Sequence, residues 1–316
     1  MAVGFYNVEN FYDTIPSLFY DDRDYTPKGR NHWNAERYAR KLGNIVRVLD
    51  HMSLDLIALA EVENEAVVRD LVETLSTDYC YIHRTTSDRR GMDLAVLYKG
   101  DKFIPERVRQ VDLGASRQAL HIRGRLVGSM VDVVVCHLPS ALNSNRYRTR
   151  ALRSLADLVD SLRLADPRSG LVVMGDMNCT PDERIVRENF PTGRGAHLIE
   201  TLEAQRRQGE GSYVYRGDWQ MVDNIFVTEN MLYGNGLRLK EAGVFIRDYL
   251  LSEGGAMPRG WPLRTFAGRL CLGGYSDHLP VFIILEKMPK AGMPDRPAPL
   301  SNSEKGYSPA KPTEMN

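Results

Sequence analysis

Three short polar stretches decide the fold of this chain: NVEN at residues 7–10, GDMN at 175–178 and SDH at 276–278. Each adjoins an apolar run. LVVM at 171–174 leads into GDMN, and LPVFII at 279–284 follows SDH. Short apolar runs bounded by polar residues are typical of buried strands. The sequence therefore predicts strands with polar residues at their ends, where open α/β architectures bind ligands.

Outward from these stretches, further apolar runs alternate with helical patterns. Strands are also predicted over 54–64, 92–100, 130–140 and 221–228, and helices over 36–52, 64–76 and 145–164. Many of the apolar runs are nearly continuous, which favours sheets covered on both faces. Residues 180–183, TPDE, combine a Thr N-cap with Pro at the first helical position, so a helix is predicted directly after GDMN.

Composition and charge place limits on the partners. Lysine and arginine number 41, as do aspartate and glutamate, so the formal net charge of the 316 residues is zero. No whole-protein field favours nucleic acid, and tight duplex binding would need clustered cations. No apolar stretch reaches the ~20 residues that span a bilayer, so no membrane insertion is expected. The compartment stays open: cytoplasmic for a full-length chain, exported if a leader was removed.

The chain is expected to form one catalytic domain over residues 1–287. Residues 288–316 are rich in Pro and Ser with few large apolar side chains, so they predict a disordered tail. No internal repeat is present, which argues against a solenoid or propeller. Nothing in the sequence indicates an obligate protein partner.

The polar residues at the strand ends suit phosphoester hydrolysis. That reaction needs a cation to neutralise charge, an activated water and donors for the phosphoryl oxygens. Hard oxygen ligands such as Glu61, Asp277 and Glu9 favour Mg²⁺ or Mn²⁺, and zinc is disfavoured because no thiolate or paired-histidine spacing occurs. Asn7 and Glu9 stand two positions apart in the first strand and are expected on one face of it.

Together the motifs resemble those of the endonuclease/exonuclease/phosphatase superfamily, which includes deoxyribonucleases, apurinic endonucleases, inositol polyphosphate 5-phosphatases and neutral sphingomyelinases. The likeness covers about residues 3–287. It is carried by FYNVEN, LAEVEN, RGMDLAVLY with Asp93, CHLPS, GDMNCTP, MVDNIFV and YSDHLPV. The resemblance implies an α/β (α+β) fold, a four-layer α/β/β/α sandwich like that of deoxyribonuclease I, with the active site at one end of two facing sheets.

The resemblance also implies roles. Glu61 would be the principal metal ligand, Asn7 and Glu9 would complete or orient the shell, and Asp277 would lie nearby. Glu9 stands where apurinic endonucleases have Asp, which lengthens its reach by one methylene.

The remaining motif residues would carry the chemistry. His278, oriented by Asp223, would contact the phosphate or accept the proton of the attacking water, and Asp176 is the rival for activating that water. Asn178 would donate a hydrogen bond to a phosphoryl oxygen. His137 would be the general acid for the leaving oxygen.

Arginines near the predicted cleft are candidates for binding phosphate, because the planar guanidinium binds it bidentately. Arg117 is the first choice, and a surface role is favoured for the others, Arg90, Arg146, Arg148 and Arg150.

Three functions follow from this sequence. The first is a nuclease-like phosphodiesterase, favoured by His137, with a phosphoester substrate and nucleic acid as one candidate. The second is a phosphatase or phospholipid phosphodiesterase of the inositol-phosphate or sphingomyelin type. The third is a catalytically silent binding module, which the retention of all the motif residues disfavours.

Overall fold

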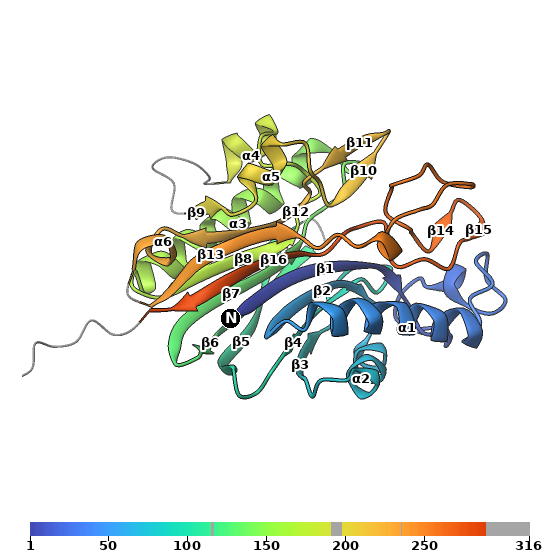
Figure 1. The fold of residues 1–316 in the computed structure, drawn as a ribbon, viewed down its shortest axis with the longest axis horizontal. Coiled ribbons are helices and arrows are strands. Elements are labelled where there is room, and N and C mark those ends of the chain that lie inside the picture. The colour runs from blue at the N-terminus through green and yellow to red at the C-terminus, as the bar shows by residue number, and fades with distance from the viewer. Residues whose placement is uncertain (115–116, 191–197, 235, 289–316) are drawn as a thin grey trace, which may run out of the picture.

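Two six-stranded sheets pack face to face with helices on their outer sides (Figure 1). The structure, a computed structural model, describes residues 1–114, 117–190, 198–234 and 236–288. The first sheet has the order β13-β16-β1-β2-β4-β3 and the second β5-β6-β7-β8-β12-β9. Strands β1 and β2 run parallel, as do β7 and β8, whereas the other neighbouring strands are antiparallel.

The bounds of the strands are as follows. The first sheet comprises β1 (Ala2–Phe11), β2 (Leu56–Val62), β3 (Cys80–Arg84), β4 (Asp93–Tyr98), β13 (Leu237–Val244) and β16 (Val281–Lys287). The second comprises β5 (Phe103–Gly114), β6 (Arg117–Leu126), β7 (Ser129–His137), β8 (Gly170–Asp176), β9 (Leu198–Glu200) and β12 (Asp223–Thr228). Two ribbons stand apart: β10 (Tyr213–Tyr215) with β11 (Asp218–Gln220), and β14 (Phe266–Ala267) with β15 (Leu270–Cys271).

Four helices cover the outer faces of the sheets: α1 (Ala35–Met52), α2 (Glu65–Thr74), α3 (Asn145–Ala165) and α4 (Arg184–Asn189). The shorter α5 (Glu203–Arg207) and α6 (Asn230–Tyr233) flank β12 in the sequence, and Met231 of α6 packs in the core between the sheets. The 3-10 turns are η1 (Arg23–Tyr25) and η2 (Asp248–Leu250). Asn34 and Asn64 cap α1 and α2, each accepting the N–H three residues on. Because Asn64 closes the LAEVEN motif, β2 passes into α2 within two residues.

Three apolar cores separate four layers. One core lies between the sheets and includes Phe5 and Val172. A second joins the first sheet to α1 and α2 through residues such as Ile45, and a third joins the second sheet to α3 and α4 through residues such as Leu155. This arrangement confirms the predicted four-layer α/β/β/α sandwich.

One predicted boundary is wrong. Helix α4 begins at Arg184 with Glu183 as its N-cap, whereas the sequence predicted a start at Thr180. The side chain of Glu183 accepts the Thr180 N–H at 2.8 Å, and the Glu183 N–H bonds back to the Thr180 carbonyl at 3.0 Å. These two bonds close a turn, so GDMN leads into a loop before the helix.

Two further predictions concern the C-terminal tail and the membrane. Residues 289–316 of the predicted tail lie outside the described residues. Among the helices in the described ranges, none is both long and apolar enough to cross a membrane.

Candidate active site

The inner face of the sandwich changes from apolar to polar at one end. Side chains two positions apart on a strand share a face, so on four strands the outermost apolar residue of the inter-sheet core has a polar neighbour on the same side. The pairs are Phe5 and Asn7 on β1, Val135 and His137 on β7, Met174 and Asp176 on β8, and Ile225 and Asp223 on β12. Strand alternation alone therefore brings four of the predicted site residues together.

Strand direction puts these residues at the same end. Asp176 ends β8 and pairs in register with Asp223, which begins the antiparallel β12. The SDH motif precedes β16, which runs antiparallel to β1, so His278 also arrives where β1 ends. This end lies to the right in Figure 1.

Bulges in β1 and β2 aim the first two acidic residues. The pairing shifts register between Asn7 and Phe11 and between Ala60 and Val62. Glu61 has a φ of 65°, in the left-handed region that costs energy for a side-chain-bearing residue. Regular alternation would turn Glu61 away from the face of Ala60, and a bulge can redirect it.

Hydrogen bonds hold the redirected Glu61. Its Oε1 accepts the side-chain amide of Asn7 at 3.2 Å, and its Oε2 accepts the Asn10 N–H at 2.9 Å. Asn10 itself has a φ of 52°, as does its neighbour Glu9 at 51°. The expected alternation of Asn7 and Glu9 therefore ends at the bulge, and their side chains contact different partners.

Two carboxylates from opposite sheets meet around Asn7 and His137. Nδ2 of Asn7 also donates to Oδ2 of Asp176 at 3.1 Å. Nε2 of His137 lies 3.8 Å from Oε1 of Glu61 and 3.6 Å from Oδ2 of Asp176. Burial, reinforced by the charge of Asp223, raises the pKa of the Asp176 carboxyl to about 7.

A second group pairs His278 with Asp223. Nδ1 of His278 lies 2.7 Å from Oδ2 of the buried Asp223, and the ring of Tyr213 packs against the imidazole at 4.8 Å. Burial opposes charge on the imidazole. The carboxylates of Asp223, Asp176 and Asp277 outweigh burial and hold the pKa of His278 well above its usual range.

His137 has the opposite electrostatic character. Burial first, then the nearby Arg117, lowers its pKa well below the usual value. Nη1 of Arg117 lies 3.5 Å from Nδ1 of His137 and 3.1 Å from Asp88. Because an arginine can only donate, this contact favours the tautomer with the proton on Nε2, facing the two carboxylates.

Asn178 and Arg148 line the turn after β8. Asn178 has a φ of 49°; its N–H donates to Oδ1 of Asp176 at 2.8 Å and its Nδ2 to the Leu138 carbonyl at 2.9 Å. An amide nitrogen carries two hydrogens, so one remains for another acceptor. Arg148 donates to the Asn178 carbonyl at 3.2 Å, so this arginine supports the turn.

Glu9 and Asp277 share an arginine that the sequence reasoning missed. Oε2 of Glu9 accepts the Thr265 N–H at 2.6 Å, and its Oε1 lies 3.4 Å from Nε of Arg264. Nη2 of the same Arg264 donates to Oδ2 of Asp277 at 2.6 Å. Nζ of the buried Lys41 stands 3.9 Å from Glu9. Two of the predicted ligands thus already have cationic partners.

The donor set at Glu61 and Asp176 fits a hard divalent cation. Neither carboxylate has a Lys or Arg within 4.0 Å among the described residues, although Asp176 is buried. Oxygen ligands of this kind suit Mg²⁺, Mn²⁺ or Ca²⁺. Asp176, Asp223 and His278 also offer ligand atoms within 4.8 Å of one another, but Nδ1 of His278 and Oδ2 of Asp223 already bond each other.

A four-layer sandwich of this topology, with carboxylates and histidines gathered at one end, is the architecture of metal-dependent phosphoric ester hydrolases. The chain belongs to the Endonuclease/Exonuclease/phosphatase family, whose family model matches residues 2–287. That match confirms the predicted family and the class of enzyme. No sequence among the curated proteins matches the chain.

Solved structures share the fold. A humanized D. rerio TDP2 carrying 14 mutations is 13% identical with a TM-score of 0.62, over 90% of this chain and 98% of that one. The D. rerio TDP2 complexed with a single strand DNA product is 14% identical with a TM-score of 0.61, over the same shares of the two chains. A mannosyl-6-phosphatase from Bacteroides thetaiotaomicron is 14% identical with a TM-score of 0.60, over 90% and 99%. At these identities the likeness is one of fold.

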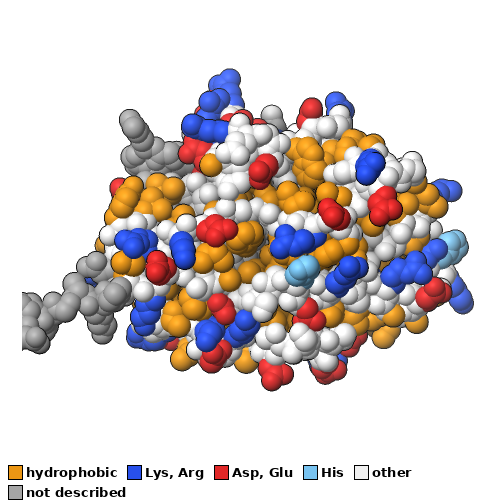
Figure 2. Space-filling model, in the orientation of Figure 1, with side chains coloured by type: hydrophobic (Ala, Val, Ile, Leu, Met, Phe, Trp, Pro, Cys, Tyr) orange, Lys and Arg blue, Asp and Glu red, His pale blue; other side chains and the backbone are white. Residues whose placement is uncertain are grey.

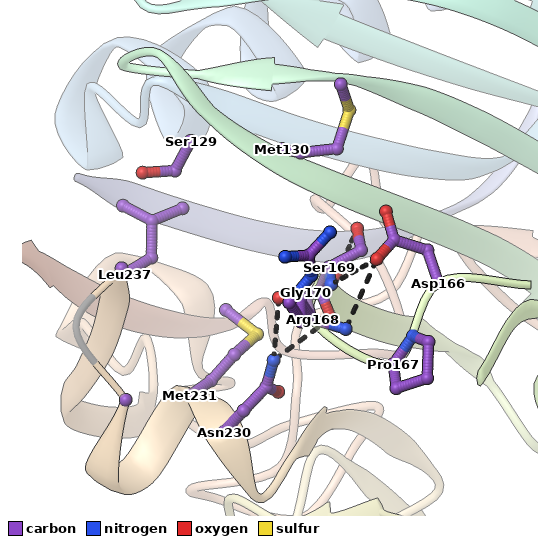
Figure 3. Close-up of a pocket in the computed structure, with 12 residues that line it drawn as sticks. Ser129, Met130, Asp166, Pro167, Arg168, Ser169, Gly170, Asn230, Met231 and Leu237 are labelled. Carbon is purple, nitrogen blue, oxygen red and sulfur yellow. Dashed lines mark hydrogen bonds between the residues drawn. The ribbon is translucent and has the colours of Figure 1, made fainter. Parts of the chain in front are cut away.

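A cavity at the opposite end of the sheets contains none of the predicted site residues. Figure 3 shows Asn230 at its edge, donating at 3.1 Å to the carbonyls of Arg168 and Ser169. Gly170, which also lines it, begins β8, whereas Asp176 ends that strand. Six strand steps separate the two, roughly 20 Å. The cavity is therefore remote from the candidate active site.

Proposed function

We propose that this chain is a divalent-metal-dependent phosphodiesterase of the nuclease-like kind. The observation that carries the proposal is the meeting of Glu61 and Asp176, from opposite sheets, around Asn7 and His137. Nucleic acid single strands or ends are the favoured substrates. The zero formal net charge supports weak rather than tight duplex binding. On the face drawn in Figure 2, the acidic and basic side chains are interspersed.

In this proposal Glu61 holds the ion, and Asn7 orients the shell because its amide donates to Glu61 and Asp176. Asp277 lies nearby, and Mg²⁺ or Mn²⁺ is the expected metal. When bound, the ion polarises a phosphoryl oxygen and neutralises charge that develops on it. We assign Glu9 to the support of the site, because its two oxygens already contact Thr265 and Arg264.

Asp176 is our choice for activating water. Its pKa of about 7 suits a base that works near neutral pH. His278 is the rival from the sequence, but an imidazole held by Asp223 and facing two further carboxylates favours the protonated form. We therefore assign His278 to binding a phosphoryl oxygen through Nε2–H.

The remaining donors complete the assignment. The second amide hydrogen of Asn178 points to a phosphoryl oxygen in this scheme. The mostly buried guanidinium of Arg117, which also contacts Asp88, binds the neighbouring phosphate oxygens. His137 has a lowered pKa, which favours hydrogen-bond donation from Nε2 to the leaving oxygen over full proton transfer. This assignment refines the general-acid role predicted from the sequence.

A phosphatase acting on a small phosphorylated molecule is the second candidate. It is supported by the fold that the chain shares with a mannosyl-6-phosphatase.

A substrate panel tests the proposal. Purified protein is given single-stranded and duplex oligonucleotides, plasmid, hexose phosphates, inositol phosphates and sphingomyelin vesicles, each with Mg²⁺, Mn²⁺ or chelator. We expect metal-dependent cleavage of oligonucleotides, with turnover lowered roughly 10²- to 10⁴-fold in Glu61→Ala and in His278→Ala. Hydrolysis of hexose phosphates with intact oligonucleotides would select the second candidate. Unchanged turnover in either variant would remove the mechanism.

A further inference from the structure

The segment between β13 and β16 delivers Arg264 to the active site. Figure 1 shows this segment, in orange, at the same end of the molecule as the loop after β1. The Leu263 N–H bonds the Leu250 carbonyl at 2.7 Å, and the Leu263 carbonyl accepts the Tyr275 N–H at 2.6 Å. A Cβ on Gly274 would lie 2.1 Å from the Leu263 oxygen, so this close approach requires glycine. The backbone thereby fixes Arg264 next to the SDH motif.

Arg264 joins the carboxylates of two motifs. Its Nη2 donates to Oδ2 of Asp277 at 2.6 Å, and its Nε lies 3.4 Å from Oε1 of Glu9. The residues NVEN and SDH are more than 260 positions apart in the sequence. One guanidinium therefore connects the strand that carries Asn7 to the loop that carries His278.

Buried groups anchor the far side of this bridge. Glu9 is 4% exposed and its second oxygen accepts the Thr265 N–H. Lys41, 1% exposed, donates to Oγ1 of Thr265 at 2.7 Å and to the Tyr275 carbonyl at 2.6 Å. Two carboxylates thus face two cations, and a buried charge that loses its partner is strongly unfavourable. Glu9 is held in place, while Arg264 remains 36% exposed at its side chain.

The bridge orients Asp277. With Oδ2 bound to Arg264, Oδ1 is directed toward His278 and lies 3.8 Å from its Nε2. Nη1 of Arg264 has no hydrogen-bond partner recorded in the part of the chain that the structure describes. The guanidinium of Arg264 also offsets one negative charge in a site that already contains Glu61, Asp176 and Asp223.

We propose that Arg264 is a positioning residue, which fixes Asp277 beside His278 through its bridge to Glu9 and tempers the affinity of the site for the divalent cation. This inference rests on the proposed function. It predicts two effects of opposite sign when Arg264 is neutralised. Turnover falls because Asp277 is free to rotate, and cation affinity rises because one positive charge has left.

The test compares three variants of the full chain. Arg264→Gln removes the charge, Arg264→Lys keeps the charge but cannot span two carboxylates, and Arg259→Gln is the control, an exposed arginine of the same segment. Mn²⁺ binding is measured by calorimetry without substrate. The values of kcat and KM are measured on the substrate that the substrate panel described above identifies.

We expect Arg264→Gln to bind Mn²⁺ roughly three- to ten-fold more tightly and to lose about 10- to 100-fold in kcat. Arg264→Lys should bind Mn²⁺ like the wild type with part of the kcat loss, and Arg259→Gln should match the wild type in both. A merely structural role would weaken Mn²⁺ binding in Arg264→Gln, and that result overturns the inference.

Two further outcomes separate the inference from the proposed function. If the wild type binds Mn²⁺ but neither Arg264 variant changes affinity or kcat, the inference is wrong and the proposed function stands. If the wild type binds no Mn²⁺ and shows no metal-dependent turnover, the proposed function fails first. Should Arg264→Gln fail to fold, Arg264→Lys decides alone, because unchanged kcat in that variant overturns the positioning role.

Discussion

The contact between His278 and Asp223 gives the sharpest test of the mechanism. Replacing Asp223 by Asn keeps the size of the side chain and removes its charge. The bond to Nδ1 of His278 is 2.7 Å long and buried, and a hydrogen bond to a charged group contributes about 1.5–3 kcal/mol. If that energy is used to hold the imidazolium on the phosphate, Asp223→Asn should lower kcat roughly 10- to 150-fold.

The pH profile then identifies the role of His278. Asp223 is the first of the carboxylates that raise the pKa of His278, so the variant should have a lower pKa at this imidazole. A required imidazolium is present below its pKa and is lost as the pH rises through it. The basic limb of kcat should therefore move to lower pH in Asp223→Asn. The assay is a pH series of initial rates, with Asp218→Asn, an exposed aspartate of β11, as the control.

Two results would refute this reasoning. If the basic limb stays in place, an imidazolium at His278 is not required and the role assigned to it is wrong. The acid limb does not decide the question, because Asp223 also raises the pKa of Asp176 and its removal should lower that pKa as well. If kcat of Asp223→Asn stays within two-fold of the wild type across the series, the contact between the two residues has no catalytic role.

Three further predictions concern stability. Burial raises the pKa of Glu63 from 4.5 to about 8, so its contribution to stability is present below about pH 4 and is lost as the pH rises through 8. With chelator present, the free energy of urea unfolding of Glu63→Gln should therefore depend less on pH over this range than that of the wild type or of the exposed Glu73→Gln. The same pH dependence in all three proteins would contradict the prediction. Mn²⁺ at 100 times its Kd should stabilise the wild type by about 2.7 kcal/mol. The gain in melting temperature should vanish in Glu61→Gln, and an undiminished gain would place the ion elsewhere. Leu155→Ala in α3 should lower the free energy of urea unfolding by about 2–5 kcal/mol, whereas the exposed Leu164→Ala should lower it by under about 0.5 kcal/mol. Similar losses in both variants would argue against the apolar core between α3 and the second sheet.

Much of the site follows from strand alternation, which the sequence displays. Asp176 and His137 each come two residues after an apolar residue of the inter-sheet core, so their position at the end of the sheets could be predicted. The four-layer sandwich was predicted from the resemblance of the motifs to those of the endonuclease/exonuclease/phosphatase superfamily, and alternation alone would not have given it.

Local backbone geometry limited the prediction. Alternation put Asn7 and Glu9 on one face, but the bulge after Asn7 gives Glu9 a positive φ and sends its carboxylate to Thr265 and Arg264. No residue pattern marks such a bulge in advance. The start of α4 was wrong because Glu183 bonds the Thr180 N–H and serves as the cap itself.

The cations around Glu9 were also missed. Lys41, Ile45 and Val48 share the four- and three-residue spacing of the apolar face of α1, and a lysine on such a face signals a buried partner. Arg264 lies in a segment without regular periodicity, so its approach to Asp277 depends on tertiary contacts and on the glycine at 274. Only the three-dimensional arrangement connects it to the motifs.

The division of the site between two sheets has a mechanical consequence. Asn7 bonds Asp176 of the opposite sheet, and His278 bonds Asp223 of the opposite sheet. Neither sheet alone therefore contains a complete pair. A slide of one sheet past the other by a single residue, about 3.3 Å, would separate both pairs while leaving each sheet intact. Turnover therefore depends on how the two sheets are aligned. Small changes in the packing between the sheets should reduce turnover before they reduce the melting temperature.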